Sequence, residues 1–454
     1  MTARDYCRLA LLVLAPLSLW GQSTSSSGAA RTQQNPPSAT ASLSGSGGFY
    51  TPSPSGLVGA RNLISLGTDL STSYDDNVAQ TNANRLSDTG FLISPRLTVS
   101  REDGPLAMAL SYRPTFLVYR HQTAYNEQDH DLNFDANYRA TDRLSLGAET
   151  SVLYRSSLLD SLTGGAAFGP GSPGLLNNSI ITPFANQFEN NSRVDVHYLV
   201  SRRSAIELFT TYMLRSFNKP ATSSLALFQT EGKSAGLRYL YRSSPRSTIV
   251  LTSLYETFHT GDGTRLGLSI ASLDWSMAVT PRLQVNLFAG PVYSQMRGNV
   301  LVPFGSLVTL SFPIDRSDWH WAAGGGIVFA RDKNTFRLSA SRQVTDGGGL
   351  LDAVTSDVIG ESFERRLGRE WTVQSMAGWQ RNAALAAAAE QGQLEGEYGR
   401  ITILRRVSPV LTIGTGYEYQ RQSVGGSVPL GANFDRNFVY FTLAYRFKDI
   451  PLGR

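Results

Sequence analysis

The stretch NFVYFTLAYRF, residues 437–447, decides the fold class of this chain. Side chains of an extended strand point alternately to two faces. One face of this stretch is strongly apolar and aromatic, and it consists of Val439, Phe441, Leu443, Tyr445 and Phe447. The opposite face ends in the charged Arg446. The alternation predicts a β-strand that separates an apolar medium from a more polar one.

The same alternation recurs in segments throughout residues 61–448. Eight short turns, such as 141–143 and 280–282, alternate with nine longer polar connections, such as 156–187 and 297–316. Short turns on one side and long loops on the other are typical of outer-membrane barrels. The sequence therefore predicts an all-β fold: a transmembrane antiparallel up-and-down β-barrel of about 18 strands.

Three positions leave a 16-strand barrel open as an alternative. Pro95 and Pro114 fall inside predicted strands, where each removes a ladder hydrogen bond, so a bulge or an earlier strand end is expected there. The apolar phase also changes between Ile270 and Leu273, which predicts another bulge. A soluble β-sandwich would show the same alternation with its apolar faces turned inward. The long series of segments and the N-terminal sequence favour the membrane barrel.

The sequence before the barrel has two parts. Residues 1–21 predict a signal peptide, because Arg4 and Arg8 precede an apolar run that ends at Trp20. Residues 22–60 are rich in Ser, Gly, Thr, Ala and Pro and predict a disordered periplasmic leader. The outer-membrane barrel would occupy 61–448, and 449–454 would form a C-terminal tail. We expect Tyr445 and Phe447 to act as the signal that the barrel-assembly machinery reads.

Composition excludes several kinds of site. The single cysteine, Cys7, lies within the predicted signal peptide, so thiol nucleophiles and thiolate metal sites are not expected. A formal net charge of +5 is too small to indicate nucleic-acid binding. Asp129 and Asp131 beside His130, and Asp318 near His320, could form acid–base pairs, and Ser-rich strands could supply a Ser–His arrangement. No surrounding enzyme motif accompanies them, so we expect no catalysis, cofactor or metal.

Charged residues on the phase opposite to the lipid-facing one are candidates for a pore lining. We predict an acidic wall on two neighbouring strands and a basic wall on later strands across the barrel, which would orient polar solutes. Interstrand ion pairs without a common design are the alternative. The candidate pore-lining residues are Asp129, Asp131, Asp135, Glu149, Arg193, Arg238, Arg242, Arg337 and Arg342.

The sequence YDDNV, residues 74–78, is followed by Ser87-Asp88 and by ISPRL, residues 93–97. This order resembles the opening of a family of outer-membrane β-barrel porins of Gram-negative bacteria, some of whose members accompany exopolysaccharide export machinery. The resemblance implies a barrel of undefined substrate. Asp75, Asp76 and Asn77 would either bind calcium or cap the loop through side-chain to backbone hydrogen bonds.

We therefore predict a channel in the bacterial outer membrane for passive or weakly selective diffusion of small hydrophilic solutes. Its surroundings would be outer-membrane lipid and lipopolysaccharide. The alternative is an accessory barrel for exopolysaccharide export or surface attachment, in which the connection 156–187 contacts glycan. The sequence leaves the oligomeric state open.

Overall fold

The computed structural model describes residues 62–155, 186–218, 227–261, 263–304, 308–347, 353–385, 392–425 and 433–452. All of them belong to one of two units of the chain, Ala41–Arg454. The predicted signal peptide (1–21), the predicted leader (22–60) and most of the connection 156–187 lie outside the described residues.

Eighteen long strands make up most of the described residues, together with a short terminal strand and one 3-10 turn, η2 (Thr123–Tyr125). The first nine strands are β1 (Leu63–Asp75), β2 (Asp88–Asp103), β3 (Leu106–Tyr119), β4 (Glu127–Arg139), β5 (Leu144–Arg155), β6 (Asn186–Leu199), β7 (Ser204–Asn218), β8 (Thr230–Ser244) and β9 (Ser247–Thr260). The others are β10 (Arg265–Thr280), β11 (Leu283–Phe304), β12 (Val308–Arg331), β13 (Asn334–Thr345), β14 (Val354–Leu367), β15 (Trp371–Ala384), β16 (Gln393–Arg406), β17 (Leu411–Gly425), β18 (Phe434–Arg446) and the short β19 (Ile450–Pro451).

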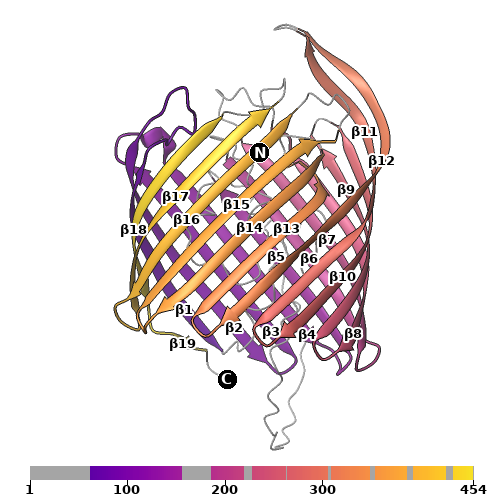
Figure 1. Ribbon diagram of the computed structural model, residues 1–454, viewed down its shortest axis with the longest axis horizontal. Coiled ribbons are helices and arrows are strands. Elements are labelled where there is room, and N and C mark those ends of the chain that lie inside the picture. Colours follow the sequence, from indigo (N-terminus) through magenta and orange to yellow (C-terminus); the bar gives the residue numbers. More distant parts are fainter. Residues whose placement is uncertain are drawn as a thin grey trace, which may run out of the picture. The chain divides into compact units, whose positions relative to one another are not determined.

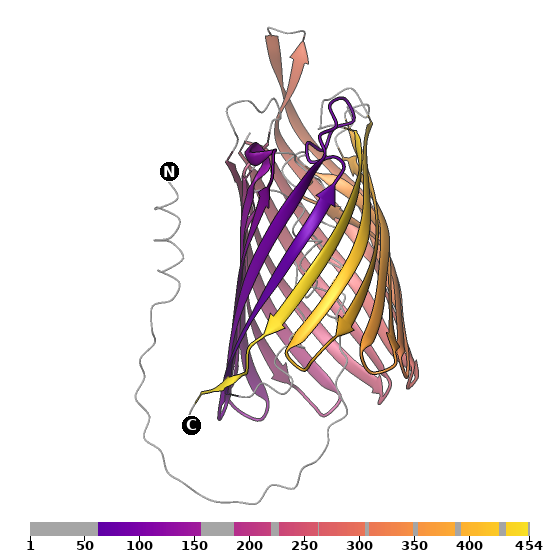
Figure 2. The same ribbon diagram turned by 90° about the vertical axis from the view of Figure 1, so that its left-hand side faces the viewer.

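The strands form one closed antiparallel barrel (Figures 1 and 2). Each long strand pairs with the next along the chain, and β18 pairs with β1 from Gly67 to Asp75. The predicted all-β, up-and-down antiparallel barrel is confirmed, and within the described residues it has eighteen long strands rather than sixteen. No helix among these residues is long and apolar enough to cross a membrane.

Exposure alternates along strands such as β9 and so distinguishes an outer from an inner face. On β9, Leu251 and Tyr255 are 53% and 54% exposed, whereas Leu254 and Glu256 between and beside them are 5% and 1% exposed. The exposed residues, such as Leu251 and Tyr255, lie on the outer face, where an apolar side chain contacts lipid. The buried residues, such as Leu254 and Glu256, point to the inside of the barrel.

Pro95 and Pro114 lie opposite each other in the barrel wall. The β2–β3 ladder is interrupted there, between the pairs Ile93↔Phe116 and Leu97↔Tyr112, yet the register is the same on both sides. The hydroxyl of Ser94 donates to the Pro114 carbonyl at 3.3 Å. The expected bulge or early strand end is therefore wrong, because the two prolines share one gap in the ladder.

The change of apolar phase between Ile270 and Leu273 is also not a bulge. Both residues keep a continuous register with β9, as the pairs Ile270↔Leu254 and Leu273↔Leu251. Ile270 is 4% exposed and points inward, whereas Leu273 is 52% exposed and lies on the outer face. The phase changes because the inner wall itself is apolar in this part of the barrel.

The connection expected at 297–316 is mostly strand. Pairing between β11 and β12 continues from Arg297↔Asp315 to Phe304↔Val308. These two strands are the longest of the barrel, and their hairpin rises above the other strands at the end that carries the longer connections (Figure 2). The sequence predicts a long connection here, because the pairing between the two halves of this stretch is not visible in the sequence.

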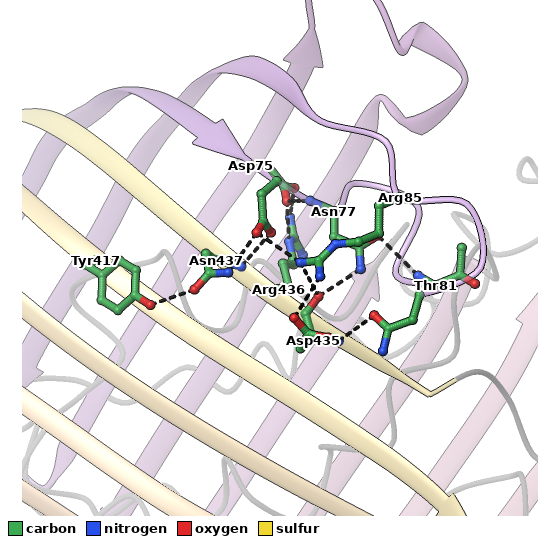
Figure 3. A network of polar contacts seen from close by, with 10 residues as sticks. Asp75, Asn77, Thr81, Arg85, Tyr417, Asp435, Arg436 and Asn437 are labelled. Atoms are coloured by element: carbon green, nitrogen blue, oxygen red, sulfur yellow. Dashed lines mark hydrogen bonds and ion pairs between the residues drawn. The ribbon is translucent and has the colours of Figure 1, made fainter.

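A buried ion pair closes the barrel between β1 and β18 (Figure 3). Arg436 Nε donates to Asp75 Oδ1 at 2.8 Å, and a second guanidinium N–H donates to Asp75 Oδ2. The Tyr119 hydroxyl also donates to Asp75 Oδ2, at 3.2 Å. Asp75 and Arg436 are 0% and 1% exposed, so the pair is removed from water. We call these three residues the closing triad.

The loop after β1 reinforces the same edge (Figure 3). The backbone N–H and the side-chain amide of Asn437 both donate to the Asp76 carboxylate at 2.7 Å. Asn77 Nδ2 donates to the Asp435 carbonyl at 2.8 Å, and Arg85 pairs with Asp435 at 2.9 Å. Side chains of the YDDNV segment thus bind the first residues of the last long strand.

Asn77 also organises the loop locally. Its backbone N–H donates to Asp75 Oδ1 at 2.9 Å, and its own Oδ1 accepts from the Thr81 N–H at 3.3 Å. These are the side-chain to backbone bonds expected of a capping role. Among the described residues no group of three or more His, Cys, Asp or Glu side chains is arranged to hold a metal ion.

The segment after β18 is tied to the first strand. Ile450 and Pro451 form β19 and pair with Ile64 and Leu63. Asp449 accepts a hydrogen bond from the Ser65 hydroxyl at 2.6 Å and lies 3.1 Å from Arg446. The Ser65 hydrogen bond and the Arg446 charge lower the pKa of the Asp449 carboxyl, so it is negatively charged at neutral pH.

Replacing Arg436 tests the closing triad. We expect Arg436→Met to lower the free energy of unfolding by about 3 to 5 kcal/mol, because it leaves the Asp75 carboxylate buried without a counter-charge. Urea unfolding of the barrel in lipid vesicles measures this loss. The control is Arg85→Met, since Arg85 is 38% exposed and an exposed pair contributes only about 0 to 1 kcal/mol. Equal losses in the two variants would contradict a special role for the buried pair.

Candidate functional site in the barrel lumen

A belt of charged residues of both signs follows the inner face from β1 to β10. It begins with two ion pairs between neighbouring strands: Arg96 lies 3.4 Å from Asp69, and Arg113 lies 3.4 Å from Asp131. Its members, which we call the charged belt, are Asp69, Arg96, Arg113, Asp131, Asp135, Glu149, Arg193, Asp195, Glu207, Arg238 and Asp274.

Register brings the middle of the belt together. Asp135 on β4 lies directly opposite Glu149 on β5, and Glu149 lies directly opposite Arg193 on β6. Directly opposed residues point to the same side of the sheet. Arg193 therefore faces the lumen beside two carboxylates, on the wall that was expected to be wholly acidic.

A stacked arrangement of two arginines marks the next part of the belt. Arg193 and Arg238 lie with their guanidinium carbons 4.5 Å from the centroid of the Phe209 ring, and both pair with the same Glu207 oxygen. The ring lies across Gly236, where an added Cβ would be 2.3 Å from Phe209 Cζ, so only glycine permits this contact. Cation–π contacts and a shared carboxylate hold the two like charges close together.

The remaining candidates with inward positions lie outside this cluster. Asp129 is 6% exposed on β4, two residues from Asp131 towards the longer connections. Arg242 is exposed at the other end of β8, beside the short turn after Ser244. Arg337 lies opposite Val328, and its Nε is buried without a hydrogen-bond partner.

Arg342 does not face the lumen. It lies opposite Ala323, and its guanidinium lies 4.9 Å from the ring centroid of Trp321, which is 56% exposed on the outer face. Asp357, also on the outer face, accepts from Arg342 at 2.6 Å and 2.8 Å. The assignment of Arg342 to the pore lining is corrected, because the inward phase of β13 is carried by its odd-numbered residues.

The expectation of opposed acidic and basic walls is also corrected. Arg193 and Arg238 are neighbours of the carboxylates rather than residues across the barrel from them, so bases and acids alternate along one wall. Strand register decides this, and the sequence does not reveal register. Acidic side chains nevertheless outnumber basic ones in the charged belt.

Sequence reasoning missed a second lumen cluster, closer to the longer connections. Arg215 Nε lies 3.2 Å from Glu189, and its Nη1 lies 2.7 Å from Asp346. All three side chains are at most 6% exposed. Glu189 and Arg215 follow the inward phase of β6 and β7, so alternation could have identified them. Asp346 follows β13, where no strand phase applies.

The histidines do not form the expected acid–base pairs. His130 points to the outer face, where its Nδ1 lies 2.8 Å from the Tyr112 hydroxyl, whereas Asp129 and Asp131 point inward. His320 points inward, and its Nε2 lies 3.0 Å from the Ser294 hydroxyl. Asp318 pairs with Arg316, and among the described residues no carboxylate hydrogen-bonds to His320. Ser294 and His320 are thus in contact, but among the described residues no carboxylate completes a Ser–His–Asp arrangement.

The inner charges and the apolar outer face together identify the kind of barrel. The fold is that of an outer-membrane β-barrel. No family model matches the chain, and no curated protein matches it.

Solved structures with a similar arrangement are distant in sequence. The outer membrane protein opdK of Pseudomonas aeruginosa has a TM-score of 0.44 and 11% identity, over 85% of this chain and 99% of that one. The FrpB iron transporter of Neisseria meningitidis has a TM-score of 0.46 and 9% identity, over 88% of this chain and 69% of that one. OccAB4 of Acinetobacter baumannii has a TM-score of 0.41 and 9% identity, over 85% and 99%.

Removing the carboxylate that the two stacked arginines share tests the belt. We expect Glu207→Gln to lower the free energy of unfolding by about 3 kcal/mol, because Arg193 and Arg238 are only 11% and 9% exposed and lose their common counter-charge. Urea unfolding in vesicles measures the change. In the control, Glu397→Gln, the lost pair is exposed and 3.9 Å long, so the change should stay within about 1 kcal/mol. A Glu207→Gln barrel as stable as wild type would show that the shared pair contributes nothing.

Proposed function

We propose that this barrel is a channel in the bacterial outer membrane through which small hydrophilic solutes diffuse passively or with weak selectivity. The observation that carries the proposal is a closed barrel of eighteen strands that is apolar outside and carries the charged belt inside. At this strand number a barrel is wide enough to leave an aqueous channel. A lumen built only for packing would not need a belt of charged side chains.

The outer surface supports membrane insertion. Large apolar side chains are exposed on it around the barrel, among them Leu208 (56%), Leu273 (52%) and Phe441 (48%). Aromatic residues such as Trp371, exposed beside the short turn after Leu367, are placed where an interfacial girdle is expected. Lipid and lipopolysaccharide would be the surroundings of this face.

The composition of the charged belt supports a preference for cations. Carboxylates exceed guanidinium groups there, and fixed charges that line a pore attract counter-ions. A preference for anions would be expected beside a wall formed by the basic candidate pore-lining residues alone. Among the described residues nothing favours the alternative role in exopolysaccharide export, and the connection 156–187 on which it depended lies largely outside them.

We propose that Tyr445 and Phe447 form the signal for the barrel-assembly machinery. Both rings are exposed on the outer face, at 38% and 47%, and they pack edge to face with centroids 4.9 Å apart. The Phe447 N–H donates to the Leu66 carbonyl at 2.9 Å, so the signal ends where β18 leaves β1. Assembly machinery that binds these two rings would therefore also lie beside the edge at which β18 pairs with β1.

Electrical recording tests the channel. Purified, folded protein added to a planar bilayer should produce step conductances, and a salt gradient should give a reversal potential on the cation-selective side. We expect the double variant Asp135→Asn, Glu149→Gln to lower the cation-to-anion permeability ratio, because it removes two acidic groups from the lumen wall. Glu361→Gln is the control, since Glu361 lies on the outer face opposite Leu338 and Ala377. A folded barrel that never conducts would contradict the proposal.

Assembly gives a separate test. We expect Phe447→Ala to reduce the amount of folded barrel in the outer membrane several-fold, whereas a chain that stops after Phe447 should still assemble. The truncated chain loses the β19 pairing, the Asp449 contacts and the hydrogen bond from the Leu452 N–H to the Asn62 carbonyl. Heat-dependent electrophoretic mobility of membrane fractions reports the folded amount. Normal levels of Phe447→Ala would show that this ring is not read.

A further inference from the structure

One part of the inner wall is apolar rather than charged. On β9 and β10 the inward residues Leu254, Phe258, Leu266, Leu268 and Ile270 are at most 5% exposed and belong to one hydrophobic cluster. We call this part of the wall the apolar sector. These side chains are packed against one another and against other buried apolar residues, so a solute that reached them would have to displace the contacts that cover them.

Glu256 lies in the middle of the apolar sector. Leu254 and Phe258 flank it on the same face of β9, and Leu268 lies directly opposite on β10. On β8 its opposite residue is Ser234. The side chain is 1% exposed, and among the described residues neither carboxylate oxygen has a hydrogen-bond partner. Glu256 is therefore a carboxylate surrounded mainly by apolar groups.

The neighbouring charges do not neutralise Glu256. The guanidinium of Arg215 is already engaged by Asp346 at 2.7 Å and by Glu189 at 3.2 Å. Asp346 interacts electrostatically with Glu256 as a like charge. Burying a carboxylate without a counter-charge or a hydrogen bond is strongly unfavourable. Without a cation beside it the side chain is therefore favoured in its neutral, protonated form, and a bound cation would stabilise the ionised form.

We propose that Glu256 and the apolar sector bind an organic cation, namely a solute with a primary ammonium group and an aromatic or aliphatic body. The ammonium N–H groups would donate to the free Glu256 oxygens, and charge-assisted bonds of this kind are among the strong ones. The apolar body packs against Phe258, Leu254 and Leu268 and takes the place of the contacts that now cover the carboxylate. A few placed polar groups on an apolar wall are typical of sites that select small molecules.

The proposal rests on the proposed channel function, because the solute reaches the apolar sector through the lumen. It also agrees with the acidic excess of the charged belt, which would concentrate cations at the site. A bare metal ion fits poorly, because no group of three or more metal-ligating side chains occurs among the described residues. A single carboxylate among leucines cannot replace the hydration shell of such an ion.

Binding of benzylammonium chloride to the full-length protein in detergent micelles tests the site without any need for conduction. Isothermal titration calorimetry should show saturable binding to wild type. Glu256→Gln should weaken it by at least about tenfold, because a charge-assisted pair becomes a neutral one. Glu361→Gln makes the same chemical change on the outer face and should bind as wild type does. Heat-dependent mobility on electrophoresis confirms that each variant is folded.

Three matched ligands separate the parts of the proposal. Benzyl alcohol has the ring without the charge, ammonium chloride has the charge without the ring, and benzoate has the opposite charge. Each should bind at least about tenfold more weakly than benzylammonium if both halves of the site contribute. Equal binding of benzyl alcohol, or an unchanged affinity in folded Glu256→Gln, would overturn the inference.

Conduction recorded in parallel distinguishes this inference from the channel itself. Step conductances without benzylammonium binding would leave the channel standing and reject the site. Binding to a barrel that never conducts would retain the cation site and reject the channel. Binding together with a concentration-dependent block of the current, lost in Glu256→Gln, is the result expected.

Discussion

The barrel depends on one constraint: inside a bilayer the backbone groups of every strand must be paired, and only closure of the sheet pairs the first strand with the last. Here β1 meets β18 over Gly67–Asp75, and β19 extends the pairing on the same side. The closing triad and the loop after β1 concentrate buried and charge-assisted contacts at this edge. The residues that join the two ends of the sheet are thus held by several buried and charge-assisted hydrogen bonds.

The alternation of side chains gives the barrel an outer face that contacts lipid and an inner face that carries charged residues. On the outer face, apolar side chains contact lipid, where they leave no polar group without a hydrogen bond. Inside, the wall carries charges that are compensated strand by strand, so that Arg193 and Arg238 can stack on Phe209 while sharing Glu207. Ion pairs between adjacent strands thus compensate several of the charges on the inner face. Acidic residues remain in excess in the charged belt.

On β9 and β10 the inward residues of the apolar sector are apolar rather than charged. Glu256 is the acidic residue within this sector. A structural core would be more stable with an apolar residue at this position, since its carboxylate has no bonded partner. Residues that cost stability without a visible return often belong to binding sites. The inward apolar residues of 266–270, which suggest a bulge in the sequence, therefore form part of the proposed cation site.

The amino-acid sequence by itself determined the fold class, a strand number of about 18 with 16 left open, and the alternation of short and long connections, because alternation and turn residues are local properties. It also placed Asp135, Glu149, Arg193 and Arg238 on the inward phase. Only the tertiary structure decided which of these residues are neighbours, that Arg342 lies outside beside Trp321, and that 297–316 continues as a hairpin. The reason is register: a strand's own residues set its two faces, but its partner and the relative shift of the two strands decide which charges meet.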